Sequence, residues 1–110
     1  MSSQEIFALR KSGQSGKALA LARENYPQNS QDVWLLRAYG WALFDHIKQT
    51  VENFENKRLS IGALNTQLKD LMSEFAKIAH PLRGDMVFSS VLQLAGKVSA
   101  SWDDFLLFAR

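Results

Sequence analysis

The chain has 110 residues, of which 46% are hydrophobic, enough for one domain with its own core, and this composition excludes an intrinsically disordered chain. The absence of cysteine excludes disulfides and thiolate metal sites, and with no signal-peptide pattern or 18-residue apolar run we expect a cytoplasmic protein without a membrane span. The net charge is only +2 and acidic residues are interleaved with basic ones, which favours a solvated surface over a phosphate-binding stripe.

The first two elements are predicted to be short helices joined by a tight turn. Ser3 can cap the first helix, and Gly13 can end it because glycine readily adopts the left-handed conformation after a helix. Ser15 can cap the second helix over residues 16–26, which Pro27 ends. Helices joined by so short a turn form an antiparallel hairpin.

A long helix over residues 31–56, about 39 Å in length, is the predicted centre of the fold. Asn29 or Ser30 is its expected cap. One apolar stripe should face the next helix, and a second stripe with Trp34 and Trp41 should pack against the N-terminal hairpin. The first stripe consists of Val33, Leu36, Tyr39, Gly40, Leu43, Ile47, Val51 and Phe54.

Two further helices follow over residues 61–79 and 86–97, the first capped by Ser60 and ended by His80-Pro81. The apolar stripe of the first consists of Ile61, Leu64, Leu68, Leu71, Phe75 and Ile78. Its solvent side is predicted to carry Lys69, Asp70, Glu74 and Lys77. A sixth helix is expected after Ser101, which resembles the start of a capping box.

The last predicted helix is strongly apolar, and the given chain stops two residues after Phe108. Either this helix docks on the body of the domain, or the 110 residues are the N-terminal fragment of a longer protein. A third alternative is a homodimer that buries Trp102, Phe105 and Phe108.

Residues 13–44 resemble the helix hairpin of tetratricopeptide repeats. The residues that carry the resemblance are Gly13, Ala18, Leu19, Ala22, Pro27, Trp34, Tyr39 and Gly40. The helical patterns along the chain predict an all-α fold of five to six antiparallel helices. The resemblance implies that the N-terminal hairpin is repeat-like and packs on the long central helix. It also implies a protein-interaction module whose long helix lines the binding surface.

No constellation of residues predicts catalysis, a metal site or a cofactor, so we expect a protein that is not an enzyme. His46 and Asp45 are adjacent on a helix and point about 100° apart, and His80 suits the end of a helix dipole. The segment 13–18 differs from a phosphate-binding loop because Ala18 replaces the magnesium-binding hydroxyl residue.

The predicted partner-binding residues lie on the second face of the long helix, because tryptophan and arginine are enriched where proteins bind one another. They are Trp34, Arg37, Trp41, Asp45 and Lys48. The predicted function is a protein-interaction or scaffold module, and the alternative is a nucleic-acid-associated accessory domain. That alternative would use Arg10, Lys11, Lys17, Arg37, Lys57 and Arg58.

Overall fold

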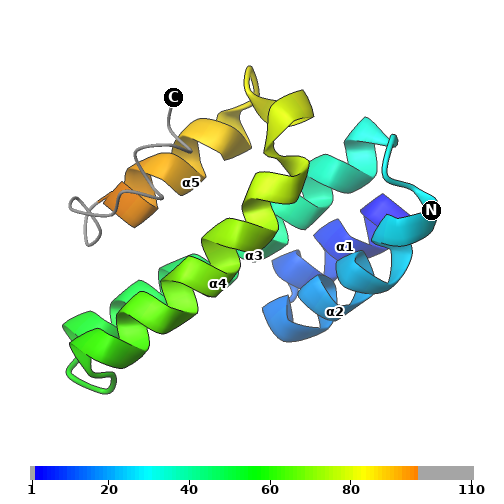
Figure 1. The fold of residues 1–110 in the computed structure, drawn as a ribbon. Coiled ribbons are helices and arrows are strands. Elements are labelled where there is room, and N and C mark those ends of the chain that lie inside the picture. The colour runs from blue at the N-terminus through cyan, green and yellow to red at the C-terminus, as the bar shows by residue number, and fades with distance from the viewer. Residues whose placement is uncertain (1, 97–110) are drawn as a thin grey trace.

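The computed structural model describes residues 2–96, and within this range the fold is all-α, as predicted (Figure 1). The helices are α1 (Ser2–Lys11), α2 (Ser15–Asn25), α3 (Val33–Glu55), α4 (Ile61–Ala79) and α5 (Met86–Gly96). Single 3₁₀ turns, η1 (Tyr26–Gln28) and η2 (His80–Leu82), follow α2 and α4. The predicted sixth helix, and with it Trp102, Phe105 and Phe108, lies outside the described residues.

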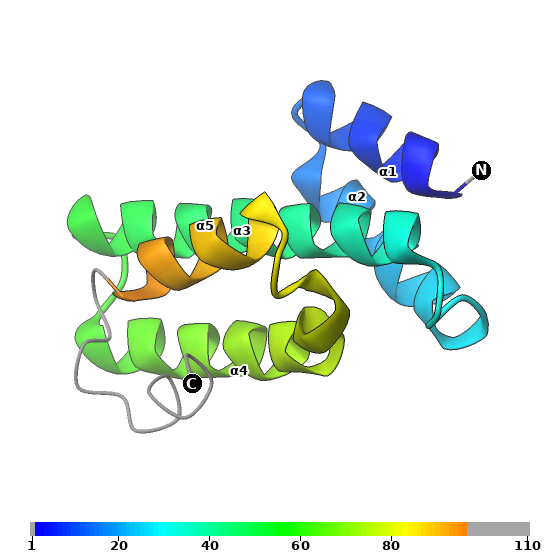
Figure 2. The ribbon, with the colours of Figure 1, turned by 90° about the horizontal axis from the view of Figure 1, so that it is seen from above.

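The helix α3 is the element against which the other helices pack, and its 23 residues give it a length of about 34 Å. The hairpin of α1 and α2 crosses its N-terminal part, whereas α4 and α5 lie along its other side (Figures 1 and 2). The predicted inward stripe is buried from Leu36 to Val51. Val33 is an exception, because it lies in the first turn and is 42% exposed.

Gly40 allows α5 and η2 to approach the middle of α3 closely. A Cβ atom at this position would lie 3.1 Å from Cγ2 of Val87 and 3.4 Å from both Cδ1 of Leu82 and Cε1 of Phe75. These three neighbours are fully buried, so little space remains for them to move. The missing side chain of Gly40 is therefore part of the packing of the core.

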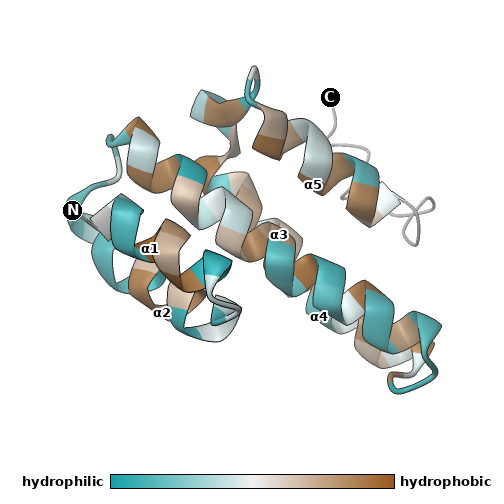
Figure 3. Ribbon diagram, turned by 180° about the vertical axis from the view of Figure 1, so that it is seen from behind, coloured by the Kyte–Doolittle hydropathy of each residue, from teal (hydrophilic) through white to brown (hydrophobic). Residues whose placement is uncertain are grey.

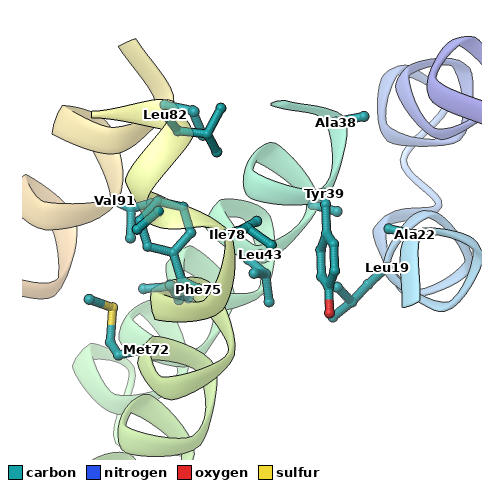
Figure 4. Close-up of a cluster of buried hydrophobic side chains, with 14 of the residues drawn as sticks. Leu19, Ala22, Ala38, Tyr39, Leu43, Met72, Phe75, Ile78, Leu82 and Val91 are labelled. Carbon is teal, nitrogen blue, oxygen red and sulfur yellow. The ribbon is translucent and has the colours of Figure 1, made fainter. Parts of the chain in front are cut away.

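Small side chains also form the contact between the hairpin and α3. Ala18 and Ala22 of α2 and Ala38 and Ala42 of α3 are all fully buried. Figure 4 shows Ala38 on the side of α3 that faces the hairpin, and Ala22 on α2 of that hairpin. Alanine side chains of this size allow two helix backbones to approach closely.

Helix caps are confirmed at one predicted position and differ at others. The Ser60 hydroxyl accepts a hydrogen bond from the amide of Ala63, as predicted for α4. Asp32, and not Asn29 or Ser30, caps α3, because its carboxylate accepts bonds from Trp34 and Leu35. Ser15 is the first residue of α2 and makes no capping bond, since the chain enters the helix one residue earlier than predicted.

Two helices end through the same hydrogen-bonded turn, but with different residues in the left-handed position. After α1, Gly13 has a φ of +81° and donates to the carbonyl of Arg10, while Gln14 donates to Leu9. After α3, Lys57 takes the corresponding position with a φ of 62°. Arg58 then donates to Asn53, which completes the same Schellman pattern.

Replacing Lys57 by glycine should raise the free energy of unfolding by about 1 kcal/mol, because glycine adopts a positive φ without steric cost. The converse change, Gly13→Ala, should lower it by about 1 kcal/mol, since the new Cβ meets no atom within 4 Å and only the backbone is strained. Urea unfolding measures both. Lys57→Ala is the control, and an equal gain from that variant would contradict the conformational explanation.

Candidate interaction surface

The first two predicted partner-binding residues, Trp34 and Arg37, form a stacked pair at the N-terminal end of α3. The guanidinium carbon of Arg37 lies 4.9 Å from the centre of the Trp34 ring, and its Nε donates to Oδ2 of Asp85 at 2.5 Å. Trp34 is 60% exposed, so the prediction that it packs against the hairpin is wrong.

Asp85 also connects this pair to the start of α5. Its other carboxylate oxygen accepts a bond from the amide of Val87 at 3.1 Å, so one side chain both caps α5 and holds Arg37. The next residue, Met86, is 73% exposed. We call the surface formed by Trp34, Arg37, Asp85 and Met86 the Trp34 patch.

The next two predicted residues, Trp41 and Asp45, are engaged by α1. The guanidinium of Arg10 donates to both carboxylate oxygens of Asp45, at 2.6 and 3.0 Å, and lies 5.2 Å from the centre of the Trp41 ring. Trp41 is half-buried and meets Phe44 edge to face at 5.3 Å. Trp41 therefore faces the hairpin as predicted, while the Asp45 carboxylate is already paired within the chain.

Lys48, the last of the five, is exposed at the side of a polar groove that runs along the C-terminal half of α3. The groove has a volume of about 330 Å³, and Asp45, Gln49 and Asn53 also line it. The structure thus divides the predicted surface into the Trp34 patch, an internal contact with α1, and this groove.

A further cleft, between α2 and α4, contains a cluster that the sequence analysis did not predict. Arg23 donates two hydrogen bonds of 2.7 Å to the carboxylate of Glu74, which also accepts a bond from the Tyr39 hydroxyl. The cleft has a volume of about 350 Å³. Figure 4 shows Tyr39 on the side of α3 that faces α2. Glu74 is half-buried, so the prediction that it lies on the solvent side of α4 is wrong.

The three groups of this cluster alter one another's protonation. Burial raises the pKa of Glu74, but the hydrogen bonds from Arg23 and Tyr39 outweigh it and hold that pKa below its usual value. Burial and the neighbouring carboxylate raise the pKa of the Tyr39 hydroxyl, which stays protonated and donates. At neutral pH Tyr39 is uncharged and donates a hydrogen bond to the carboxylate of the Arg23–Glu74 ion pair. The cluster therefore links α2, α3 and α4.

The basic residues of the nucleic-acid alternative are distributed over different parts of the fold. Arg10 and Arg37 are held by Asp45 and Asp85. The remaining four are exposed and lie near two separate turns, Lys11 and Lys17 by the α1–α2 turn and Lys57 and Arg58 at the α3–α4 turn.

Within residues 2–96, no three histidine, aspartate or glutamate side chains are grouped so that they could hold a metal ion. The Nε2 atom of His46 lies 3.3 Å from the carbonyl oxygen of Ser15, and His80 is exposed at the end of α4. No helix of the described part is long and apolar enough to cross a membrane.

Comparison with known proteins gave no match, whether by protein-family profiles, among curated proteins or among solved structures.

Glu74→Gln should reduce the loss of unfolding free energy that occurs as the pH falls into the acid range. A lowered pKa in the folded state means that this carboxylate stabilises the fold fully above its unfolded value of 4.5, and that the contribution is lost as pH falls through the folded pKa. The difference in unfolding free energy between wild type and variant should therefore be largest near neutral pH and shrink below 4.5. Urea unfolding over a pH series measures it. Asp70→Asn, at an exposed position of α4, is the control, and an identical pH profile for both variants would contradict the assignment.

Proposed function

We propose that this protein is a protein-interaction or scaffold module that acts in the cytoplasm and uses a repeat-like helical surface. The cytoplasmic setting is supported by the absence of cysteine, which fits a reducing compartment. The repeat-like surface is suggested by the resemblance to tetratricopeptide hairpins, whose small residues correspond to the buried Ala18 and Ala22 of α2. It covers residues 13–44, from the end of α1 to the middle of α3.

The observation that carries the proposal is the exposed and preorganised Trp34 ring. A tryptophan that is 60% exposed contributes little to the core, yet Arg37 stacks on it and Asp85 fixes Arg37 in turn. Fixing a side chain before binding lowers the entropy lost when a partner docks. Tryptophan and arginine are the residue types that most often dominate binding energy at protein interfaces.

The chemistry of the patch favours a partner that offers an apolar side chain. Arg37 and Asp85 neutralise each other, so the patch presents an aromatic face and the flexible thioether of Met86 with little net charge. Tryptophan side chains bury on the order of 150–250 Å². Covering the exposed part of this ring would contribute about 3 kcal/mol to the free energy of binding, at about 25 cal/mol per Å² of apolar surface removed from water.

Trp34→Ala should leave the fold intact but weaken partner binding by about thirtyfold or more, as expected for the loss of a central aromatic contact. A photo-reactive amino acid at position 34 can capture the partner in cells, with the same group at the exposed Ala20 of α2 as control. The protein captured only from position 34 is then purified, and its affinity for wild type and Trp34→Ala is measured by calorimetry. Unchanged affinity would refute the proposal.

The nucleic-acid alternative makes a different prediction. Binding through phosphates weakens steeply with salt, whereas binding to an apolar patch changes little. Retention on heparin that persists above physiological salt and is lost on replacing Lys57 and Arg58 would favour the alternative.

A further inference from the structure

The polar groove along the C-terminal half of α3 contains hydrogen-bonding groups that nothing in the described part of the chain uses. The side chains of Gln49, Asn53 and Asn56 line it and make no hydrogen bond within residues 2–96. In Figure 3 much of the ribbon in this half of α3 has the colour of hydrophilic residues. Asp45, at one end of the groove, differs because Arg10 holds its carboxylate.

The turn after α3 brings a second cation to the groove. Lys57 has a positive φ, which turns the chain back so that the amide of Arg58 donates to the carbonyl of Asn53 at 2.8 Å. Arg58 consequently lines the same groove as Lys48, although α3 has already ended. Backbone geometry, and not helical periodicity, places this residue.

The spacing of the three amides matches an extended peptide. Along the helix axis Gln49 and Asn53 are separated by about 6 Å, and Gln49 and Asn56 by about 10.5 Å. An extended chain advances about 3.3 Å per residue, so these intervals correspond to about two and three residues. Each amide side chain offers both donors and an acceptor, which suits the N–H and C=O groups of a peptide backbone.

The charges in the groove favour an acidic ligand. Lys48 and Arg58 lie toward its two ends, whereas Glu52 is the one lining carboxylate that lacks an ion pair within residues 2–96. Since Arg10 neutralises Asp45, the other charged side chains of the groove sum to one net positive charge. The distance along the helix axis from Lys48 to the end of α3 is about 10 Å, which corresponds to about three residues of extended chain.

From this arrangement we propose that the groove binds an extended peptide segment of a partner protein that carries two acidic side chains about three residues apart. The amides bind its backbone, and Lys48 and Arg58 bind its carboxylates. The groove is separate from the Trp34 patch, and the proposal shares with the proposed function only that the partner is a protein, so either can fail alone.

A nucleic acid fits the groove less well. Its phosphodiester backbone offers acceptors but no regular series of donors, so the acceptor oxygens of the three amides would have no partner there.

The test uses fluorescent peptides of about nine residues in a serine–threonine background, with two glutamates separated by two residues. A matched peptide carries glutamine at both positions, a third carries N-methyl groups on the central amides, and an oligothymidine of similar length is the nucleic-acid probe. Binding to the whole protein is followed by fluorescence polarisation. We expect the acidic peptide to bind about tenfold or more tightly than each of the other three.

The protein variants are Lys48→Glu with Arg58→Glu in one chain, and Asn53→Ala with Asn56→Ala in another. Each should weaken binding of the acidic peptide by about tenfold. The control, Lys11→Glu with Lys17→Glu, changes net charge equally at exposed positions of the α1–α2 hairpin and should have little effect. Equal loss in the control, unchanged binding of the N-methylated peptide, or tighter binding of the oligothymidine would each overturn the proposal. A Trp34→Ala variant that still binds the peptide shows that the two surfaces act separately.

Discussion

Close approach at the middle of α3 is the constraint on which the rest of the fold depends. Ala38 and Ala42 are fully buried small residues on α3, and Gly40 leaves the space in which Val87 and Phe75 pack. Larger side chains at these positions would push the hairpin and the α4–α5 layer away from α3. Because packed interiors have almost no free volume, displacement at this point would disturb both layers together.

Three arginines then connect the layers that this packing brings together. Arg10 joins α1 to α3, Arg23 joins α2 to α4, and Arg37 joins α3 to the turn before α5. Each guanidinium binds a carboxylate at least 35 residues away in the sequence. These pairs use charges that would otherwise be free for a ligand, whereas Trp34, Met86 and the open side chains of the α3 groove remain exposed.

Local patterns predicted the elements well because they depend on neighbouring residues. The bounds of α4, its Ser60 cap and the end of α1 at Gly13 all follow from sequence within one or two turns. The left-handed Lys57 was not predicted, because a lysine in that conformation carries no local signal. The start of α3 at Val33 was also missed, since several polar residues before it could have served as cap.

The sequence by itself determined the helical class of the described chain, the place of its helices and the inward stripe of α3, because hydrophobic periodicity and capping act over a few residues. It also identified the row of residues from Trp34 to Lys48, since one helix face is set by residue spacing. Only the tertiary structure decided which side chains of that row are exposed and which are paired with other parts of the chain. Arg10, Asp85 and the turn at Lys57 come from other parts of the chain, and long-range pairs of this kind leave no periodic pattern.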